Sequence, residues 1–251
     1  MIAIISPAKT LDYTREVPPL PVTQPRFAED AGRLAAAAAK LSKKKLGDLM
    51  HISPRLAELN VERFRGFDAL PERPALYAFA GDVYSGFEVH SLDEEAVLFA
   101  QEHLRILSGL YGLLRPLDAI RPYRLEMGTR WAPRKGDLYA FWADRIAKTL
   151  ADDLAEQGDG IVINLASKEY WTAAGRHLDP AVRVIEIDFR EEGPGGLRFN
   201  TFAAKRARGM MARHICEHRL TDPQALKAFD SDGYRYDAAN SDEGRWRFFR
   251  R

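Results

Sequence analysis

The stretch "LRILSGLYGLLRPLDAIRPYRLEMGTRW", residues Leu104–Trp131, places a glycine-rich turn between an apolar segment and a run of arginines, prolines and aromatics. The residues that lead into it, "EEAVLFAQEHLRIL", set apolar side chains on one helical stripe at Val97, Ala100, Leu104 and Leu107. Ser91 and Glu94 have the spacing of a capping box ahead of this stripe. We therefore expect a helix that continues into the quoted stretch and ends at "SGLYG".

Short apolar segments elsewhere in the chain have the length of buried strands. They are "MIAII" at the first residues, and "GIVINLAS" and "VRVIEIDF" in the second half. The segment "ALYAFAGDVYSGF" predicts a strand that enters a loop bounded by Gly81 and Gly86. The final "YRYDAANSDEGRWRFFR" predicts a β-hairpin.

Helical segments alternate with these strands. "SPRLAELNVERFRGF" has Ser53 as a candidate N-cap and Pro54 at the first helical position, and "LYAFWADRIAKTLADDLAEQG" closes at Gly158. Further helices are expected in "FAEDAGRLAAAAAKLS", "KEYWTAAG" and "AAKRARGMMARHICEHR". This order predicts the α/β class, with mixed α and β elements in a single domain over residues 1–251. A central mixed sheet would be flanked by helices.

Composition excludes a disulfide-rich or membrane-spanning protein but does not identify a binding partner. The chain has 251 residues, with 37 Lys and Arg against 36 Asp and Glu, so net charge alone identifies no partner. Cys216 is the one cysteine, which excludes a disulfide framework and fits a reducing compartment. No segment has the pattern of a signal peptide or the length of a membrane span. We therefore expect a cytoplasmic protein with no membrane partner.

Positive charge is concentrated in two places. Between Arg105 and Lys135, seven cationic side chains face two carboxylates, and the turn at Gly109 and Gly112 would offer backbone N–H groups to a phosphate. Between Lys205 and Arg219, five cationic side chains face one carboxylate. This pattern is typical of a protein that binds a phosphate backbone. The alternative is an ordinary turn, with arginines on solvated faces.

Polar side chains also follow the expected strands, where α/β proteins bind ligands. Lys9 follows the first strand and can bind phosphate or act as a nucleophile, or it can simply pair with Asp12. The other candidates are Asp82, Arg124, Glu126, Asn164, Ser167 and Glu169. If they converge with Lys9, they would form a polar pocket with Lys9, Asp82, Glu126 and Glu169 as catalytic candidates.

Metal ligands are sparse. His214 and His218 are four residues apart on one expected helix, but no third ligand accompanies them, and the other histidines are scattered. Cys216 has apolar neighbours typical of a buried small hydrophobe. We predict neither a metal site nor a cofactor.

The motifs "SPAKTLD", "FAGDVYSG", "HLRILSGLYGLLRPLDAIRPYRLEMG", "LYAFW", "INLASKEYW" and "AKRARGMMAR" together resemble the YaaA family of bacterial peroxide stress resistance proteins. The resemblance extends from Ser6 to Arg213. It implies an α/β fold particular to the family, with a helix-hairpin-helix-like element and a positively charged cleft. It also implies DNA binding and peroxide survival through low levels of unincorporated iron. The hairpin element would be "LSGLYG", with Gly109 and Gly112 as its glycines.

Two functions from different classes follow. The first is non-specific binding of duplex DNA, with phosphate contacts from Lys9, Gly109, Gly112, Arg115, Arg121, Arg124, Lys205, Arg206 and Arg208. The second is an enzyme that acts on a phosphorylated small molecule or on damaged nucleic acid in a pocket around Lys9. Direct sequestration of iron is a third option, for which the chain supplies few clustered ligands.

Overall fold

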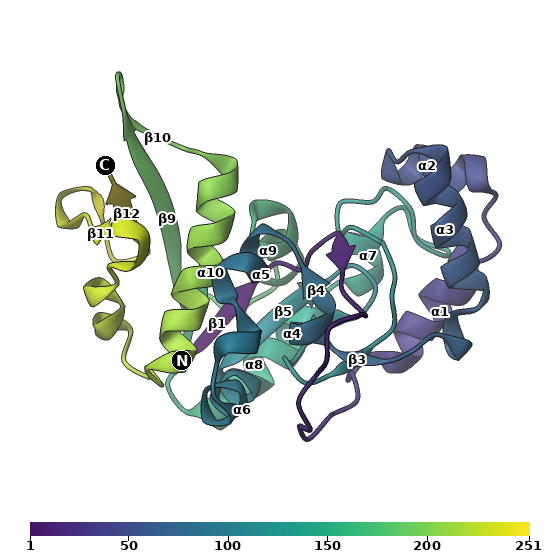
Figure 1. The fold of residues 1–251 in the computed structure, drawn as a ribbon, viewed down its shortest axis with the longest axis horizontal. Helices are drawn as coiled ribbons and strands as arrows, with labels where there is room; N and C mark the ends of the chain where they lie inside the picture. The colour runs from purple at the N-terminus through teal and green to yellow at the C-terminus, as the bar shows by residue number, and fades with distance from the viewer.

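A central eight-stranded sheet organises the computed structural model, which describes residues 1–251 (Figure 1). Five strands run parallel in the order β12-β9-β8-β1-β5, and β11, β10 and β6 pair antiparallel with them. Their bounds are β1 Ile2–Ile5, β5 Leu104–Ser108, β6 Gly112–Leu114, β8 Ile161–Asn164, β9 Arg183–Gly193, β10 Gly196–Arg198, β11 Arg235–Tyr236 and β12 Arg245–Arg250. The predicted α/β class with a central mixed sheet is confirmed.

The order of the parallel strands locates the place where a ligand can enter. From β1 the chain crosses to β5 on one side, and it then returns to place β8 on the other side of β1. Such a reversal opens a crevice outside the carboxyl ends of the two strands between which it occurs. Here those strands are β1 and β8, which pair with Ile4 opposite Asn164.

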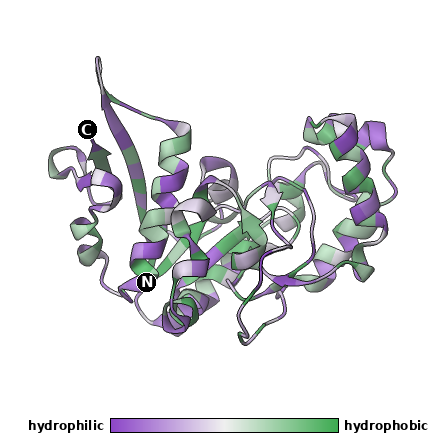
Figure 2. Cartoon of the chain, in the orientation of Figure 1, coloured by the Kyte–Doolittle hydropathy of each residue, from purple (hydrophilic) through white to green (hydrophobic).

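Two groups of helices pack on the sheet. The first contains α5 (Asp82–Phe87), α6 (Glu94–His103) and α10 (Thr201–Glu217), and both α6 and α10 contact β1. The second contains α8 (Arg145–Gln157) and α9 (Lys168–Gly175), which contact each other, β6 and β5. The central strands are hydrophobic, whereas the outer faces of the helices carry hydrophilic residues (Figure 2). None of these helices is both long enough and apolar enough to cross a membrane.

Three further helices form a lobe at the end of the molecule away from β9 and β12 (Figure 1). They are α1 (Ala28–Ala38), α2 (Lys43–Met50) and α3 (Pro54–Arg65). Ser53 caps α3 through its Oγ, which accepts a hydrogen bond from Leu56 N, and Pro54 takes the first helical position. These two predictions are confirmed, but α2 was not predicted. Only three residues, His51–Ser53, connect α2 to α3, so this pair is a helical hairpin.

The glycine-rich stretch differs from its prediction. Helix α6 ends at His103, and Leu104–Ser108 form strand β5, which is buried along its whole length. Gly109 and Gly112 then bound a tight turn between antiparallel strands, with Ser108 paired to Gly112. The helix-hairpin-helix element is therefore wrongly placed at "LSGLYG", because this turn joins two strands. The capping-box prediction is also wrong, since Asp93 caps α6 through Ala96 N.

The segment Ala75–Phe87 also differs from its prediction. It contains one helical turn, α4 (Ala75–Ala78), a short strand, β4 (Phe79–Ala80), and then α5 in place of the expected loop. Strand β4 pairs with β2 (Thr10–Leu11). The remaining short elements are β3 (Arg73–Pro74), which pairs with β7 (Ala119–Ile120), and α7 (Leu138–Trp142). The predicted C-terminal hairpin and the end of α8 at Gly158 are confirmed.

Candidate functional site

A pocket of about 420 Å³ lies at the reversal between β1 and β8. Its walls come from four parts of the chain: the residues after β1, the start of α5, the residues after β8, and α10. The charged side chains that line it are Lys9, Asp82, Glu169, Lys205 and Arg208. Residues from distant parts of the sequence, singled out as candidates for catalysis or phosphate binding, therefore share one pocket.

Ion pairs bring two more candidates to this pocket, which we call the β1/β8 pocket. Lys9 Nζ lies 3.2 Å from Glu126 Oε1, and Arg124 Nη2 lies 3.1 Å from the same oxygen. Lys9 thus pairs with Glu126 and not with Asp12, whose carboxylate accepts hydrogen bonds from Thr14. The hydrogen bond from the Thr14 backbone is the main cause that lowers the pKa of Asp12 to about 2.

Hydrogen bonds fix the floor of the β1/β8 pocket. Ser6 Oγ accepts a hydrogen bond from Ser167 N at 2.9 Å, which ties the end of β1 to the residues after β8. Glu169 Oε1 accepts one from Gly128 N at 2.8 Å, so this carboxylate is held from one side. Asn164 is the last residue of β8. Its Oδ1 accepts a hydrogen bond from Ala166 N, which shapes the turn after the strand. The pocket is a preformed, polar crevice.

The glycine turn lies elsewhere and is inaccessible. Gly109 and Gly112 are both buried, and a Cβ atom on Gly109 would lie 2.2 Å from the backbone oxygen of Leu125. The carbonyl of Gly109 accepts a hydrogen bond from Trp142 Nε1 inside the core. Because the turn is covered by protein, its N–H groups cannot contact a phosphate of DNA, contrary to the expectation from the sequence.

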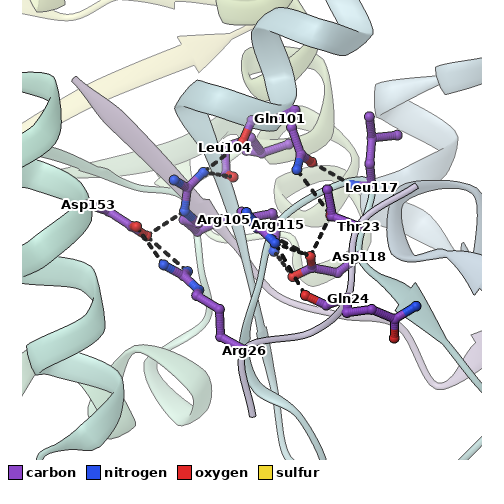
Figure 3. A network of polar contacts seen from close by, with 10 residues as sticks. All are labelled: Thr23, Gln24, Arg26, Gln101, Leu104, Arg105, Arg115, Leu117, Asp118 and Asp153. Carbon is purple, nitrogen blue, oxygen red and sulfur yellow. Dashed lines mark hydrogen bonds and ion pairs between the residues drawn. The ribbon is translucent and has the colours of Figure 1, made fainter. Parts of the chain in front are cut away.

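The arginines around this turn are neutralised by nearby carboxylates. Arg115 pairs with Asp118, Arg121 with Glu72 and Arg124 with Glu126. Arg105 is buried, and its Nε donates to Asp153 at 2.6 Å, while Arg26 contacts the same carboxylate (Figure 3). Four of the seven cations in this stretch are therefore neutralised, whereas Arg130, Arg134 and Lys135 are exposed and have no carboxylate within ion-pair distance.

A further group of exposed cations lies on the helical lobe, which the sequence analysis did not single out. Between Lys40 and Gly66, seven cationic side chains face three carboxylates. Lys43 pairs with Glu58 at 2.9 Å. Those that are exposed and have no carboxylate partner within ion-pair distance are Lys40, Lys44, Lys45, Arg55 and Arg65. In the sequence, the run "SKKK" and the later "SPR" could have indicated this group of cations.

A groove of about 630 Å³ lies in the helical hairpin between α2 and α3. Lys43, Lys44 and His51 line it, together with Pro54 at the start of α3. His51 is exposed and has a left-handed backbone with φ of 50°, which turns the chain from one helix to the next. The first turn of α3 thus faces solvent beside Lys43 and Lys44, and Asp48 is the one carboxylate that lines the groove.

The histidine pair and the cysteine do not form a reactive centre. The rings of His214 and His218 lie 4.6 Å apart, and burial lowers the pKa of His214. No group of three or more His, Cys, Asp and Glu side chains in residues 1–251 is arranged to hold a metal ion. Cys216 is buried, and burial raises the pKa of its thiol, which disfavours the reactive thiolate.

Comparison with known proteins agrees with these motifs. The family model of the peroxide stress protein YaaA matches residues 1–240. A UPF0246 protein of Rhizorhabdus wittichii is 61% identical over 249 residues, which cover 99% of this chain and 98% of that protein. A UPF0246 protein of Ralstonia pickettii is 48% identical over 258 residues, covering 100% and 99% respectively. The chain therefore belongs to the YaaA family of peroxide stress proteins.

Proposed function

We propose that this protein binds duplex DNA without sequence preference and helps to limit iron-dependent oxidative damage in the cytoplasm during peroxide stress. Membership of the peroxide stress family supports the physiological setting. The observation that carries the DNA-binding part is the helical hairpin α2–α3, with its exposed, unpaired cations.

The geometry of the hairpin suits a phosphate backbone. At the start of α3 the positive end of the helix dipole lies beside the side chains of Arg55 and Lys44, and the N–H of Arg55 has no intrahelical acceptor, so dipole and charge act in the same direction. The turn itself is held by a hydrogen bond from Ile52 N to Gly47 O. Since the contacts are made by backbone and lysine, they carry no base information, and binding is non-specific.

Side chains of α10, which packs against β9 away from the helical lobe (Figure 1), are a second group of exposed cations. Lys205 lies 3.7 Å from Asp82 Oδ2 and Arg206 lies 3.3 Å from Asp232 Oδ2, and both cations are about half exposed. Lys9 has a side chain that is 66% exposed despite its contact with Glu126. Exposed ion pairs of this kind are weak, so these cations can exchange a carboxylate for a phosphate.

A salt series measures this binding directly. We expect the affinity for a duplex to fall steeply with salt, with a log–log slope of about −0.9 for each phosphate neutralised. Lys44→Gln combined with Lys45→Gln should make the slope shallower by about two units, because two unpaired cations are lost. The matched control is Arg121→Gln with Arg124→Gln, which removes equal charge from arginines that already have carboxylate partners.

The control pair should change the slope by less than one unit. A flat salt series for the wild type would contradict electrostatic binding altogether. A larger loss in the arginine pair than in the lysine pair would place the DNA on the glycine turn and its arginines instead of the helical hairpin.

The second candidate function is an enzyme that acts on a phosphorylated small molecule or on damaged nucleic acid. The observation that favours it is the β1/β8 pocket, in which Lys9, Asp82 and Glu169 lie with two further cations. Carboxylates and cations in one preformed crevice are a common active-site composition. Its size is within the range of small-molecule sites and too small for a duplex.

A further inference from the structure

A second recess, of about 520 Å³, lies on the other side of the residues that follow β8. Its walls come from β8, α9, β9, α10 and β12, and we call it the α9 recess. Arg208 of α10 lines both this recess and the β1/β8 pocket, so the two cavities are neighbours. Both cavities open at the carboxyl edge of the parallel sheet, where α/β proteins bind ligands.

The α9 recess contains more positive charge than its own carboxylates can neutralise. Its cations are Lys168, Arg176, Arg208 and Arg245, and its single carboxylate is Glu186. Glu186 is already paired with Arg245, whose Nη2 lies 2.9 Å away. Lys168, Arg176 and Arg208 have no carboxylate within ion-pair distance; the guanidinium of Arg176 lies over the ring of Tyr139 instead.

Arg208 in particular lacks a partner. Its Nε is buried and has no hydrogen-bond acceptor. Burial lowers the pKa of this guanidinium, and Asp188 opposes the effect only through a weaker charge interaction. Asp188 itself is committed to Arg190 and Arg247. A partly buried guanidinium with a buried, unpaired Nε lacks a counter-charge, and an oxyanion bound beside it would supply that charge.

The start of α9 adds to the preference for an anion. Lys168 is the first residue of this helix, and its N-cap residue, Ser167, makes no hydrogen bond from its side chain to the first turn. The positive end of the helix dipole therefore lies beside the unpaired cations. Trp171 and Thr172, one turn later, complete this wall.

We propose that the α9 recess binds the phosphate group of a sugar phosphate, with Lys168, Arg176 and Arg208 as its cationic partners. The sugar extends past Arg208 into the β1/β8 pocket, where the carboxylates of Asp82 and Glu169 accept hydrogen bonds from hydroxyl groups. The inference extends the second candidate function by naming the ligand class, and it requires neither catalysis nor the binding of a duplex.

Calorimetric titration of the full chain with three probes tests the proposal. Ribose 5-phosphate should bind saturably and more tightly than inorganic phosphate, because it occupies both cavities, whereas ribose should show no binding. A short DNA duplex should not displace ribose 5-phosphate, because the recess is too small for it. Absence of saturable binding by both phosphate-bearing probes, or displacement by the duplex, would overturn the proposal.

Substitutions locate the site. Arg208→Gln and Lys168→Gln should each weaken the binding of ribose 5-phosphate by about 10- to 100-fold, the value of one charge-assisted contact. Arg183→Gln is the charge-matched control, because Arg183 is exposed at the amino end of β9, on the opposite edge of the sheet. Equal losses in Arg183→Gln and Arg208→Gln would show non-specific attraction and contradict the site.

A charge-preserving substitution and the measurement of duplex binding provide two further tests. Arg208→Lys keeps the charge and should retain more affinity than Arg208→Gln, which a purely structural role would not predict. Duplex binding through the helical hairpin should be unchanged in Lys168→Gln. Loss of ribose 5-phosphate binding with intact duplex binding would support the recess, while the reverse result would contradict it and leave the DNA-binding proposal standing.

Discussion

Asp153→Ala is expected to lower the free energy of unfolding by about 3–5 kcal/mol, the usual cost of removing one partner of a buried ion pair. Asp153 is 5% exposed and holds two arginines: Arg26 by two hydrogen bonds and Arg105 by one (Figure 3). Arg105 is only 4% exposed, so alanine would leave its charge buried without a counter-charge. Chemical denaturation of both proteins measures the difference.

The effect should depend on pH. Burial opposes ionisation of Asp153, but the hydrogen bonds from Arg26 and Arg105 outweigh it and lower the pKa below the usual 3.8. A lowered pKa in the folded state stabilises the fold above the unfolded pKa, and this contribution is lost as pH falls through the folded pKa. The difference between Asp153→Ala and wild type should therefore be full at neutral pH and shrink in acid.

An exposed carboxylate on the same helical segment provides the control. Asp144 pairs with Lys148 four residues later, and both side chains are largely exposed. Asp144→Ala should change the free energy of unfolding far less than Asp153→Ala does, because water screens an exposed ion pair. Equal destabilisation by the two substitutions would show that the buried pair is no more important than a surface pair.

Gly209→Ala is the second substitution with a large expected effect. Helix α10 crosses α5 with Gly209 against it, and a Cβ on this residue would lie 1.8 Å from the backbone oxygen of Val83. The reciprocal contact, from Gly86 to the oxygen of Arg206, would be 2.1 Å. Because backbone atoms cannot turn aside, the helices must separate, at a cost of about 1–3 kcal/mol or more in free energy of unfolding.

Separation of α5 from α10 would also move Asp82 away from Lys205 and widen the β1/β8 pocket. Gly32→Ala gives a control of opposite sign. Gly32 lies inside α1, where an added Cβ meets nothing within 4 Å, so alanine should stabilise the helix by about 0.5–1 kcal/mol. If the unfolding temperature shifted in the same direction in Gly209→Ala and Gly32→Ala, this result would contradict the close packing of α5 against α10.

The sequence predicts elements where local chemistry decides the structure. Strands β1, β8 and β9 are short apolar segments between turn residues, and the start of α3 follows from a serine cap and a proline. The end of α8 follows from Gly158, whose left-handed φ of 80° few other residues adopt easily. In each case, residues that are close in the sequence are sufficient to predict the element.

Elements whose structure depends on distant contacts are not predictable in this way. Leu104 and Leu107 continue the helical spacing of α6, yet they lie in β5, because pairing with β1 fixes them in the sheet. Short apolar segments fit either period. Helix α2 begins with three lysines and has no apolar stripe at that point, so its packing against α3 supplies what the pattern lacks.

Some features of the candidate site can likewise be predicted from the sequence, whereas others depend on the tertiary structure. The polar residues after β1 and β8 are visible in sequence, and the two strands are neighbours in the sheet, so Lys9 and Glu169 share a pocket. The strand order itself is a tertiary property. The burial of Gly109 and the pairing of Arg121 with Glu72 also depend on residues far away in the chain. Charge counted along the sequence therefore does not show which cations are already paired in the fold.

Amide hydrogen exchange with and without a bound duplex tests the central claim most directly. We expect new protection in residues 42–57, which contain the turn of the helical hairpin and the first turn of α3. Exchange at Gly109–Gly112 should be slow and unchanged, since this turn is already buried. Unchanged exchange in residues 42–57, with new protection elsewhere, would contradict binding of DNA by the helical hairpin.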